Sequence, residues 1–73
     1  MSRHYTKTKG TFYIYDPAAG DYFKGIYKST AEYTKYQWEA RVYKTILGAK
    51  AALEALGSGF IVVDQDGKMC VIE

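Results

Sequence analysis

Residues 45–57 are the one segment of this chain with the residue pattern of a helix, and the other segments have the patterns of strands and turns. This combination limits the folds that the chain can adopt. Thr45 is a residue type that caps helix N-termini, and Gly57 suits the left-handed position just after a helix. Between them the apolar residues recur at helical spacing and form one stripe, at Ile46, Ala49, Leu53 and Leu56. The sequence therefore predicts one amphipathic helix that covers a sheet.

Two strands joined by a turn are predicted before this helix. Residues 11–15 are β-branched or aromatic throughout, and residues 21–27 return with a similar character. Between them, residues 16–20 place Asp, Pro and Gly where a turn favours them. The first unit is therefore predicted to be a β-hairpin.

The first strand is predicted to have one buried face and one partly exposed face. Side chains alternate along a strand, so Phe12 and Ile14 share one face while Tyr13 and Tyr15 share the other. The aliphatic Ile14 assigns its own face to the core. Tyr13 and Tyr15 are then expected to form a partly exposed pair.

The middle of the chain allows more than one interpretation. Residues 28–33 are polar and are predicted to form a loop. One long strand over residues 36–42 is indicated by the alternation of Tyr36, Trp38, Ala40 and Val42. Alternatively, Thr34 begins a single helical turn that is followed by a shorter strand over residues 40–44. Periodicity leaves both alternatives open for residues 35–39.

A second hairpin is predicted after the helix. Residues 60–63 form a continuous apolar run, which is typical of a strand covered on both faces. The Asp-Gly pair within residues 64–67 is a hairpin signal, and residues 69–72 return as the last strand. The predicted fold class is α+β, with a single helix packed on a small antiparallel sheet in the order β-β-β-α-β-β.

The length of 73 residues predicts a single domain, residues 1–73, whose first ten residues form a loosely ordered basic arm. Cys70 is the only cysteine and His4 the only histidine, so neither an internal disulfide nor a metal site is predicted. Self-association into a homo-oligomer is the expected source of added stability. No apolar run reaches the roughly 18 residues of a membrane span, and the first residues lack a signal-peptide core, so a cytoplasmic protein is predicted.

Basic and aromatic residues are concentrated in the first two thirds of the chain. Residues 1–50 contain nine Lys and Arg against four acidic residues, whereas residues 51–73 contain one against four. Eleven of the twelve aromatic residues, including all eight tyrosines, also lie in residues 1–50. Tyr and Trp combine apolar area with a polar tip and are enriched at the centres of interfaces. The predicted binding residues are Tyr13, Tyr15, Lys24, Tyr27, Lys28, Arg41 and Tyr43.

No catalytic site and no cofactor are predicted. Residues 57–59, Gly-Ser-Gly, follow a helix and precede a strand, which is the reverse of a dinucleotide-binding phosphate loop. Asp64, Asp66 and Gly67 match a calcium loop only in part, and a hairpin turn explains them better. Nothing near Cys70 in the sequence would lower its pKa, so a buried apolar thiol is expected. The sequence therefore predicts a protein that is not an enzyme.

Residues 12–73 resemble a pattern in small uncharacterised bacteriophage and prophage accessory proteins. The shared features are an initial hairpin, the aromatic-Thr pair Tyr33-Thr34, an Ala-Arg-x-aromatic strand at residues 40–43, a helix capped by Thr45 and a closing hairpin. The resemblance implies an accessory protein that binds and disables a host or defence protein in the host cytoplasm. It implies no catalytic residues.

Two functions of different class are predicted from the aromatic and basic residues. In the first, they dock a protein partner, which is expected to present an acidic surface, or build a homo-oligomer. In the second, tyrosine rings stack on the bases of a nucleotide or nucleic acid while Lys and Arg contact phosphates. A third interpretation assigns most tyrosines to the rim of a small core. Steep salt dependence and bound material absorbing near 260 nm would indicate the second function.

Overall fold

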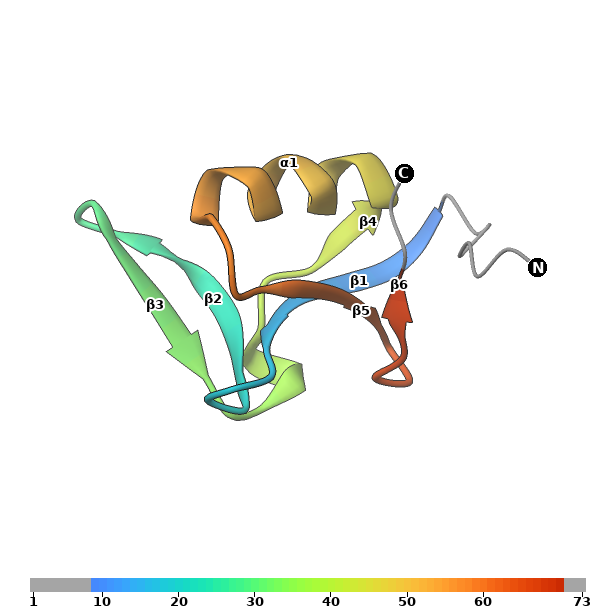
Figure 1. Cartoon of the computed structure of the whole chain (residues 1–73), viewed down its shortest axis with the longest axis horizontal. Coiled ribbons are helices and arrows are strands. Elements are labelled where there is room, and N and C mark those ends of the chain that lie inside the picture. The colour runs from blue at the N-terminus through green and yellow to red at the C-terminus, as the bar shows by residue number, and fades with distance from the viewer. Residues whose placement is uncertain (1–8, 71–73) are drawn as a thin grey trace.

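The computed structural model describes residues 9–70, which form one helix packed on a six-stranded antiparallel sheet (Figure 1). The elements are β1 (Lys9–Asp16), β2 (Asp21–Tyr27), β3 (Thr30–Thr34), the 3-10 turn η1 (Gln37–Glu39), β4 (Tyr43–Thr45), α1 (Ile46–Leu56), β5 (Ile61–Asp64) and β6 (Met69–Cys70). The predicted α+β class is confirmed. Of the predicted N-terminal arm, residues 1–8 lie outside the described residues, and residues 9–10 belong to β1.

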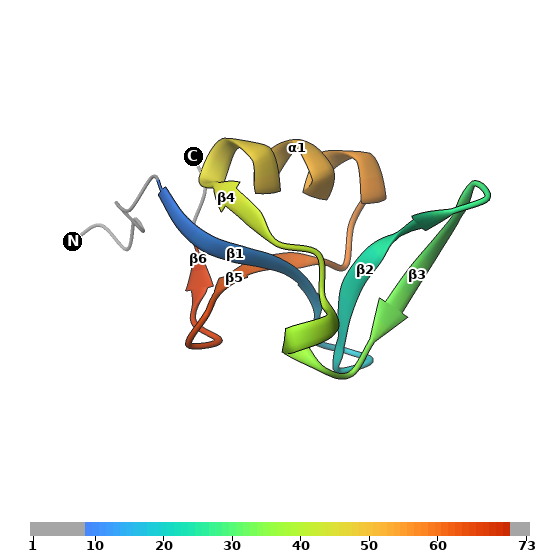
Figure 2. The same ribbon diagram turned by 180° about the vertical axis from the view of Figure 1, so that it is seen from behind.

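The sheet is built around β1. One edge of β1 pairs with β5, from Phe12 opposite Asp64 to Tyr15 opposite Ile61. The other edge is shared, because β2 pairs with its C-terminal end, at Tyr15 and Tyr22, while β4 pairs with its N-terminal half. β3 and β6 lie at the two ends of the strand order β3-β2-β1-β5-β6. β2 and β4 therefore leave the same edge of β1 and diverge, and the β2–β3 hairpin extends away from the rest of the sheet (Figure 2).

The ends of α1 lie where the sequence predicts them. The Oγ1 of Thr45 accepts a hydrogen bond of 3.1 Å from the N–H of Gly48. At the other end, Gly57 adopts a φ of 95°, and its N–H donates to the carbonyl oxygen of Leu53 over 3.1 Å. The predicted apolar stripe faces the sheet, with Ala49 fully buried and the rest half-buried against the core, namely Ile46, Leu53 and Leu56.

Replacing Thr45 by Ala is expected to lower the free energy of unfolding by about 1 kcal/mol, because the amide of Gly48 loses its acceptor. For a domain of this size, that loss corresponds to a fall in Tm of about 4–8 °C, which thermal denaturation followed by circular dichroism would measure. Thr45→Ser keeps the hydroxyl and should lose less than half as much. Equal losses in the two variants would show that the methyl group, and not the cap, is responsible.

The sheet has a core on each face. On the face beneath α1, Phe12, Ile14 and Val62 are the largest fully buried side chains, and Phe23, Ala49 and Cys70 join them. On the opposite face, Tyr13 and Val63 pack against Ala40. Val62 and Val63 thus point to different cores, which confirms the prediction that this strand is covered on both faces. The burial of the Cys70 thiol is confirmed as well.

A short segment after β3 covers this second face. The Oγ1 of Thr34 accepts a 3.1 Å hydrogen bond from the N–H of Tyr36 and donates one of 2.7 Å to Oε1 of Glu39. The Nε2 of Gln37 donates to the carbonyl oxygen of Gln65 over 3.1 Å, which ties η1 to the β5–β6 turn. Of the two alternatives for this region, the single helical turn is therefore correct. The strand that follows begins at residue 43 and not at residue 40.

The prediction of a loop over residues 28–33 is wrong. Lys28 and Ser29, with φ angles of 51° and 66°, form a two-residue turn, and the chain returns at once as β3. Two successive positive φ angles are typical of the turns that match the twist of a hairpin. Such turns normally carry Asn, Asp or Gly, so Lys-Ser gave no signal in the sequence.

The predicted closing hairpin is confirmed as far as residue 70, and residues 71–72 of its predicted last strand lie outside the described residues. The Oδ1 of Asp64 accepts hydrogen bonds of 2.9 Å from the N–H groups of both Asp66 and Lys68. These bonds hold the turn itself, as expected of an aspartate at the start of a turn. Within residues 9–70 there is no group of three or more His, Cys, Asp or Glu side chains that could hold a metal ion. The same residues contain no helix of the length and apolarity required to cross a membrane.

Candidate functional site

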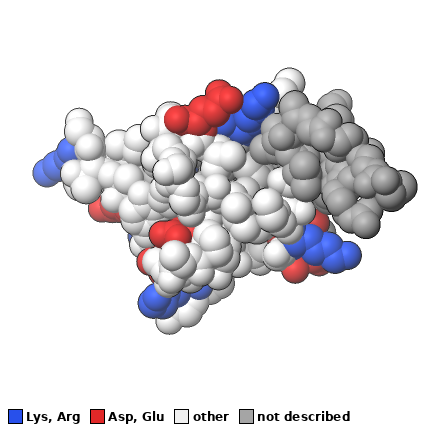
Figure 3. Space-filling model, in the orientation of Figure 1, with Lys and Arg blue, Asp and Glu red and all other residues white. Residues whose placement is uncertain are grey.

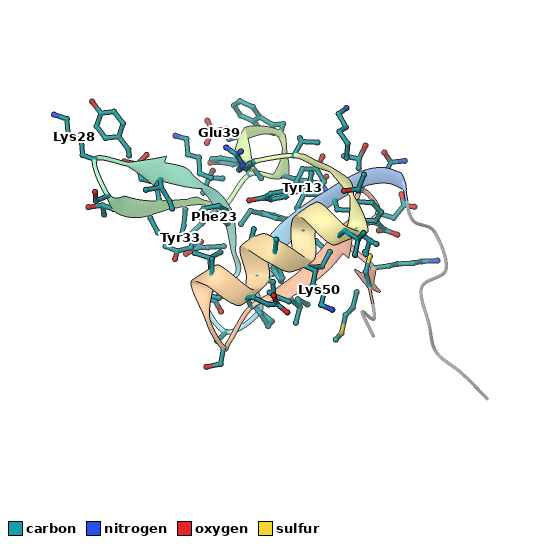
Figure 4. All side chains as sticks on the ribbon, turned by 90° about the horizontal axis from the view of Figure 1, so that it is seen from above. Tyr13, Phe23, Lys28, Tyr33, Glu39 and Lys50 are labelled. Carbon is teal, nitrogen blue, oxygen red and sulfur yellow. The ribbon has the colours of Figure 1, made fainter. Side chains whose placement is uncertain are left out.

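A half-open groove of about 410 Å³ lies where β2 and β4 diverge, beside the C-terminal half of α1. Its lining comes from three parts of the chain: Phe23, Gly25 and Ile26; Arg41 and Tyr43; and Ala52, Ala55 and Leu56. Figure 4 shows Phe23 between the base of the β2–β3 hairpin and the helix. A volume of this size is typical of sites that take a small molecule or a few side chains.

The backbone fixes the closed end of the groove. The N–H of Arg41 donates a 3.0 Å hydrogen bond to the carbonyl oxygen of Phe23, so β2 is held against the segment that leads into β4. Beyond this bond the two strands separate. On the helix side, Ala52, Ala55 and Leu56 lie on one face at helical spacing, and the two small side chains leave the groove open.

Arg41 supplies the only charge among the residues that line the groove. Its guanidinium carbon lies 5.6 Å from the centre of the Tyr43 ring, which is the geometry of a cation–π contact. Burial raises the pKa of the Tyr43 hydroxyl, and the positive charge of Arg41 partly opposes this shift. Tyr43 is therefore a neutral hydrogen-bonding group at physiological pH. Arg41 itself is exposed and has no acidic partner among the described residues.

Three more of the predicted binding residues lie on the adjacent hairpin. Lys28 is at its tip (Figure 4), and its Nζ lies 5.4 Å from the centre of the Tyr27 ring, which is 60% exposed. Lys24 is exposed on the same strand. Figure 3 shows Lys and Arg atoms at the end of this hairpin, beside a face that is largely uncharged. Lys24, Tyr27 and Lys28 belong to the hairpin that borders the groove, but none of them lines it.

Tyr13 and Tyr15 lie on the opposite face of the sheet, apart from Arg41 and Tyr43. Tyr13 is only 8% exposed, so the expectation that it belongs to a partly exposed pair is wrong, whereas Tyr15 is half-buried. The Tyr22 ring packs against both, with centroid distances of 5.9 Å to Tyr13 and 4.8 Å to Tyr15. Burial raises the pKa of Tyr22, and the two neighbouring hydroxyls raise it further. This tyrosine cluster belongs to the second core.

The sequence-based prediction missed the apolar lining of the groove. Ile26 is 68% exposed although it is aliphatic, and Ala55 is exposed at its helix face. One signal was present, because a glycine inside a strand pattern, here Gly25, often marks a bulge or a close backbone approach. A second exposed feature, the ring pair of Tyr36 and Trp38 with centroids 5.7 Å apart, lies on the η1 side and outside the groove.

The groove therefore combines an apolar floor and wall with one phenol and one guanidinium, which are groups suited to binding. Two of the seven predicted residues line it, three more lie on the hairpin that borders it, and the two tyrosines of β1 lie elsewhere. Comparisons of the chain with protein-family models, curated proteins and solved structures found no match.

Proposed function

We propose that this protein is a non-enzymatic binding module that holds a segment of a partner protein in the groove between β2 and α1. The observation that carries the proposal is an apolar groove of about 410 Å³ whose wall includes Arg41, which has no acidic partner among residues 9–70. Exposed apolar surface of this kind is typical of interaction sites. An apolar side chain of the partner would fill the groove, and a carboxylate would meet Arg41.

The resemblance to phage accessory proteins suggests a biological role for this binding. A module of this size acts stoichiometrically, and it would disable a host or defence protein by occupying one of its surfaces. The five cationic side chains between residues 23 and 45, against two acidic ones, favour an acidic partner surface.

Replacing Ala55 by Glu is expected to weaken partner binding by at least about tenfold, because it places a carboxylate among the apolar residues of the groove. Ala51→Glu is the matched control, since Ala51 is exposed on the same helix but does not line the groove. The tagged wild type and both variants would be expressed in bacterial cells, and the recovered proteins would be quantified by mass spectrometry. We expect one protein to be recovered with the wild type and with Ala51→Glu, and to be lost with Ala55→Glu.

The candidate partner would then be purified, and titration calorimetry would test for a one-to-one complex with the same dependence on Ala55. Recovery of the same proteins by all three forms would contradict the proposal. Circular dichroism of both variants would verify that the fold is retained.

A small anionic ligand is the second candidate, because the groove volume and the Arg41–Tyr43 pair also suit a nucleotide, whose phosphate would contact the guanidinium. Native mass spectrometry distinguishes this case. An added mass of a few hundred daltons together with absorbance near 260 nm would favour the nucleotide over the protein partner.

A further inference from the structure

The groove is bordered by two strand edges that no other strand covers. Within residues 9–70, β4 pairs only with β1, and beyond Phe23, whose carbonyl oxygen accepts a hydrogen bond from the N–H of Arg41, the strand β2 pairs only with β3. Tyr27 and Thr30 flank a two-residue turn and thus form a hydrogen-bonded pair. Alternation then directs the N–H and C=O groups of Ile26 away from β3 and toward the groove. Exposed edge groups of this kind are templates for a further strand.

The face of β2 beside this edge is also open. The pairing of β2 with β3 shifts between Phe23 and Gly25, which is the pattern of a β-bulge. Gly25 has a φ of 150°, and a Cβ built on it would meet no atom within 4 Å, so the space above it is open. Beside it, Ile26 is 68% exposed. The strand therefore presents a bare backbone position next to an apolar contact.

The positive charge near these strand edges favours an acidic ligand. Arg41 lines the groove without an acidic partner among the described residues, and Lys24 and Lys28 are exposed cations of β2 and the turn that follows it. Among the residues that the structure describes, no acidic side chain lines the groove. An acidic segment would be attracted to this site, and a basic one repelled.

We propose that the segment held in the groove is an extended acidic peptide of the partner, which pairs with the free edge of β2 as an added strand. Its backbone hydrogen bonds to Ile26, an apolar side chain packs between Phe23 and Leu56, and an Asp or Glu side chain pairs with Arg41. This inference rests on the proposed function and specifies the ligand of the same groove. Strand addition gives affinity through the main chain and specificity through alternate side chains.

The first test is a selection from a random ten-residue peptide library displayed on messenger RNA, with the wild-type chain as bait and Ala55→Glu as the counter-bait. We expect enriched peptides that contain Asp or Glu at a fixed spacing from an apolar residue. Enrichment of basic peptides, or no enrichment over the Ala55→Glu bait, would overturn the inference. The proposed function would still stand if Ala55→Glu abolished capture of a folded partner protein.

The second test uses the best selected peptide with N-methyl groups, which remove backbone donors, measured by fluorescence anisotropy. Because only alternate residues of an added strand face its neighbour, methylation of one set of alternate residues should weaken binding by about tenfold or more. Methylation of the other set should change it by less than about threefold. Equal effects from both sets would show that the peptide does not bind as a strand.

The third test addresses the charge. Arg41→Gln should weaken binding of the same peptide by about tenfold, because it removes a charge-assisted contact. Lys44→Gln is the matched control, since Lys44 is an exposed cation on β4 that does not line the groove. Equal losses in the two variants would mean that general attraction, and not a contact with Arg41, holds the acidic residue.

Discussion

Replacing Phe12 by Ala is expected to lower the free energy of unfolding by about 3–5 kcal/mol. Phe12 is fully buried in the centre of β1, under α1 and between β4 and β5, so its removal leaves a cavity that several elements line. A domain of this length typically has a total stability of only about 4–11 kcal/mol. Urea denaturation followed by tryptophan fluorescence should therefore show a transition shifted strongly to low urea, or a chain largely unfolded without urea.

Phe12→Leu is the control for this prediction, because it keeps most of the apolar volume. It should cost about 1.5 kcal/mol or less. A loss below about 1 kcal/mol for Phe12→Ala would contradict the assignment of this side chain to the main core.

Replacing Tyr13 by Ala is expected to lower the free energy of unfolding by about 2–4 kcal/mol, although this ring lies on the face away from the helix. The ring packs against Tyr22, Val63 and Ala40, and it is almost completely buried. The same measurement applies, with circular dichroism as a second probe. Tyr15→Ala should cost less, because Tyr15 is only half-buried.

Tyr13→Phe separates the ring from its hydroxyl. It keeps the packing, and the described residues provide no hydrogen-bond partner for the hydroxyl, so the change should stay within about 0.5 kcal/mol. This variant should also bind the partner as the wild type does, because Tyr13 lies on the opposite face from the groove. A Tyr13→Ala variant as stable as the wild type would mean that the second face is a surface and not a core.

The helix and the closing β5–β6 hairpin could be predicted from the sequence because their signals are local. Thr45 and Gly57 bond within one or two turns of α1, and the carboxylate of Asp64 accepts bonds from residues two and four positions later. In each case a short segment contains both partners of the stabilising hydrogen bond. Pattern reasoning is most reliable in that situation.

The burial of Tyr13 could not be predicted because its cover comes from a distant part of the chain. Ala40 and η1 follow β2 and β3 in the chain, so their position depends on how those two strands fold. The alternation of side chains in a strand predicts which residues share a face, but it does not predict which other segment covers that face. The groove is likewise lined by residues from distant parts of the chain. Arg41 and Tyr43 could be predicted as binding residues because a cationic and an aromatic side chain suit binding. Ala52, Ala55 and Leu56 have no such chemistry, and they become neighbours of β2 only because β2 and β4 diverge from β1.

The pairing of β1 with β5 has a consequence for synthesis on the ribosome. Phe12 lies opposite Asp64, so one edge of the central strand stays open until a segment about fifty positions later has been made. Until then β1 can pair only with β2 and β4, and the side chains that β5 covers are exposed to other nascent chains. Such non-local pairing slows folding and leaves edges open to aggregation. A chain truncated before residue 61 should therefore be captured by chaperones far more strongly than the full chain.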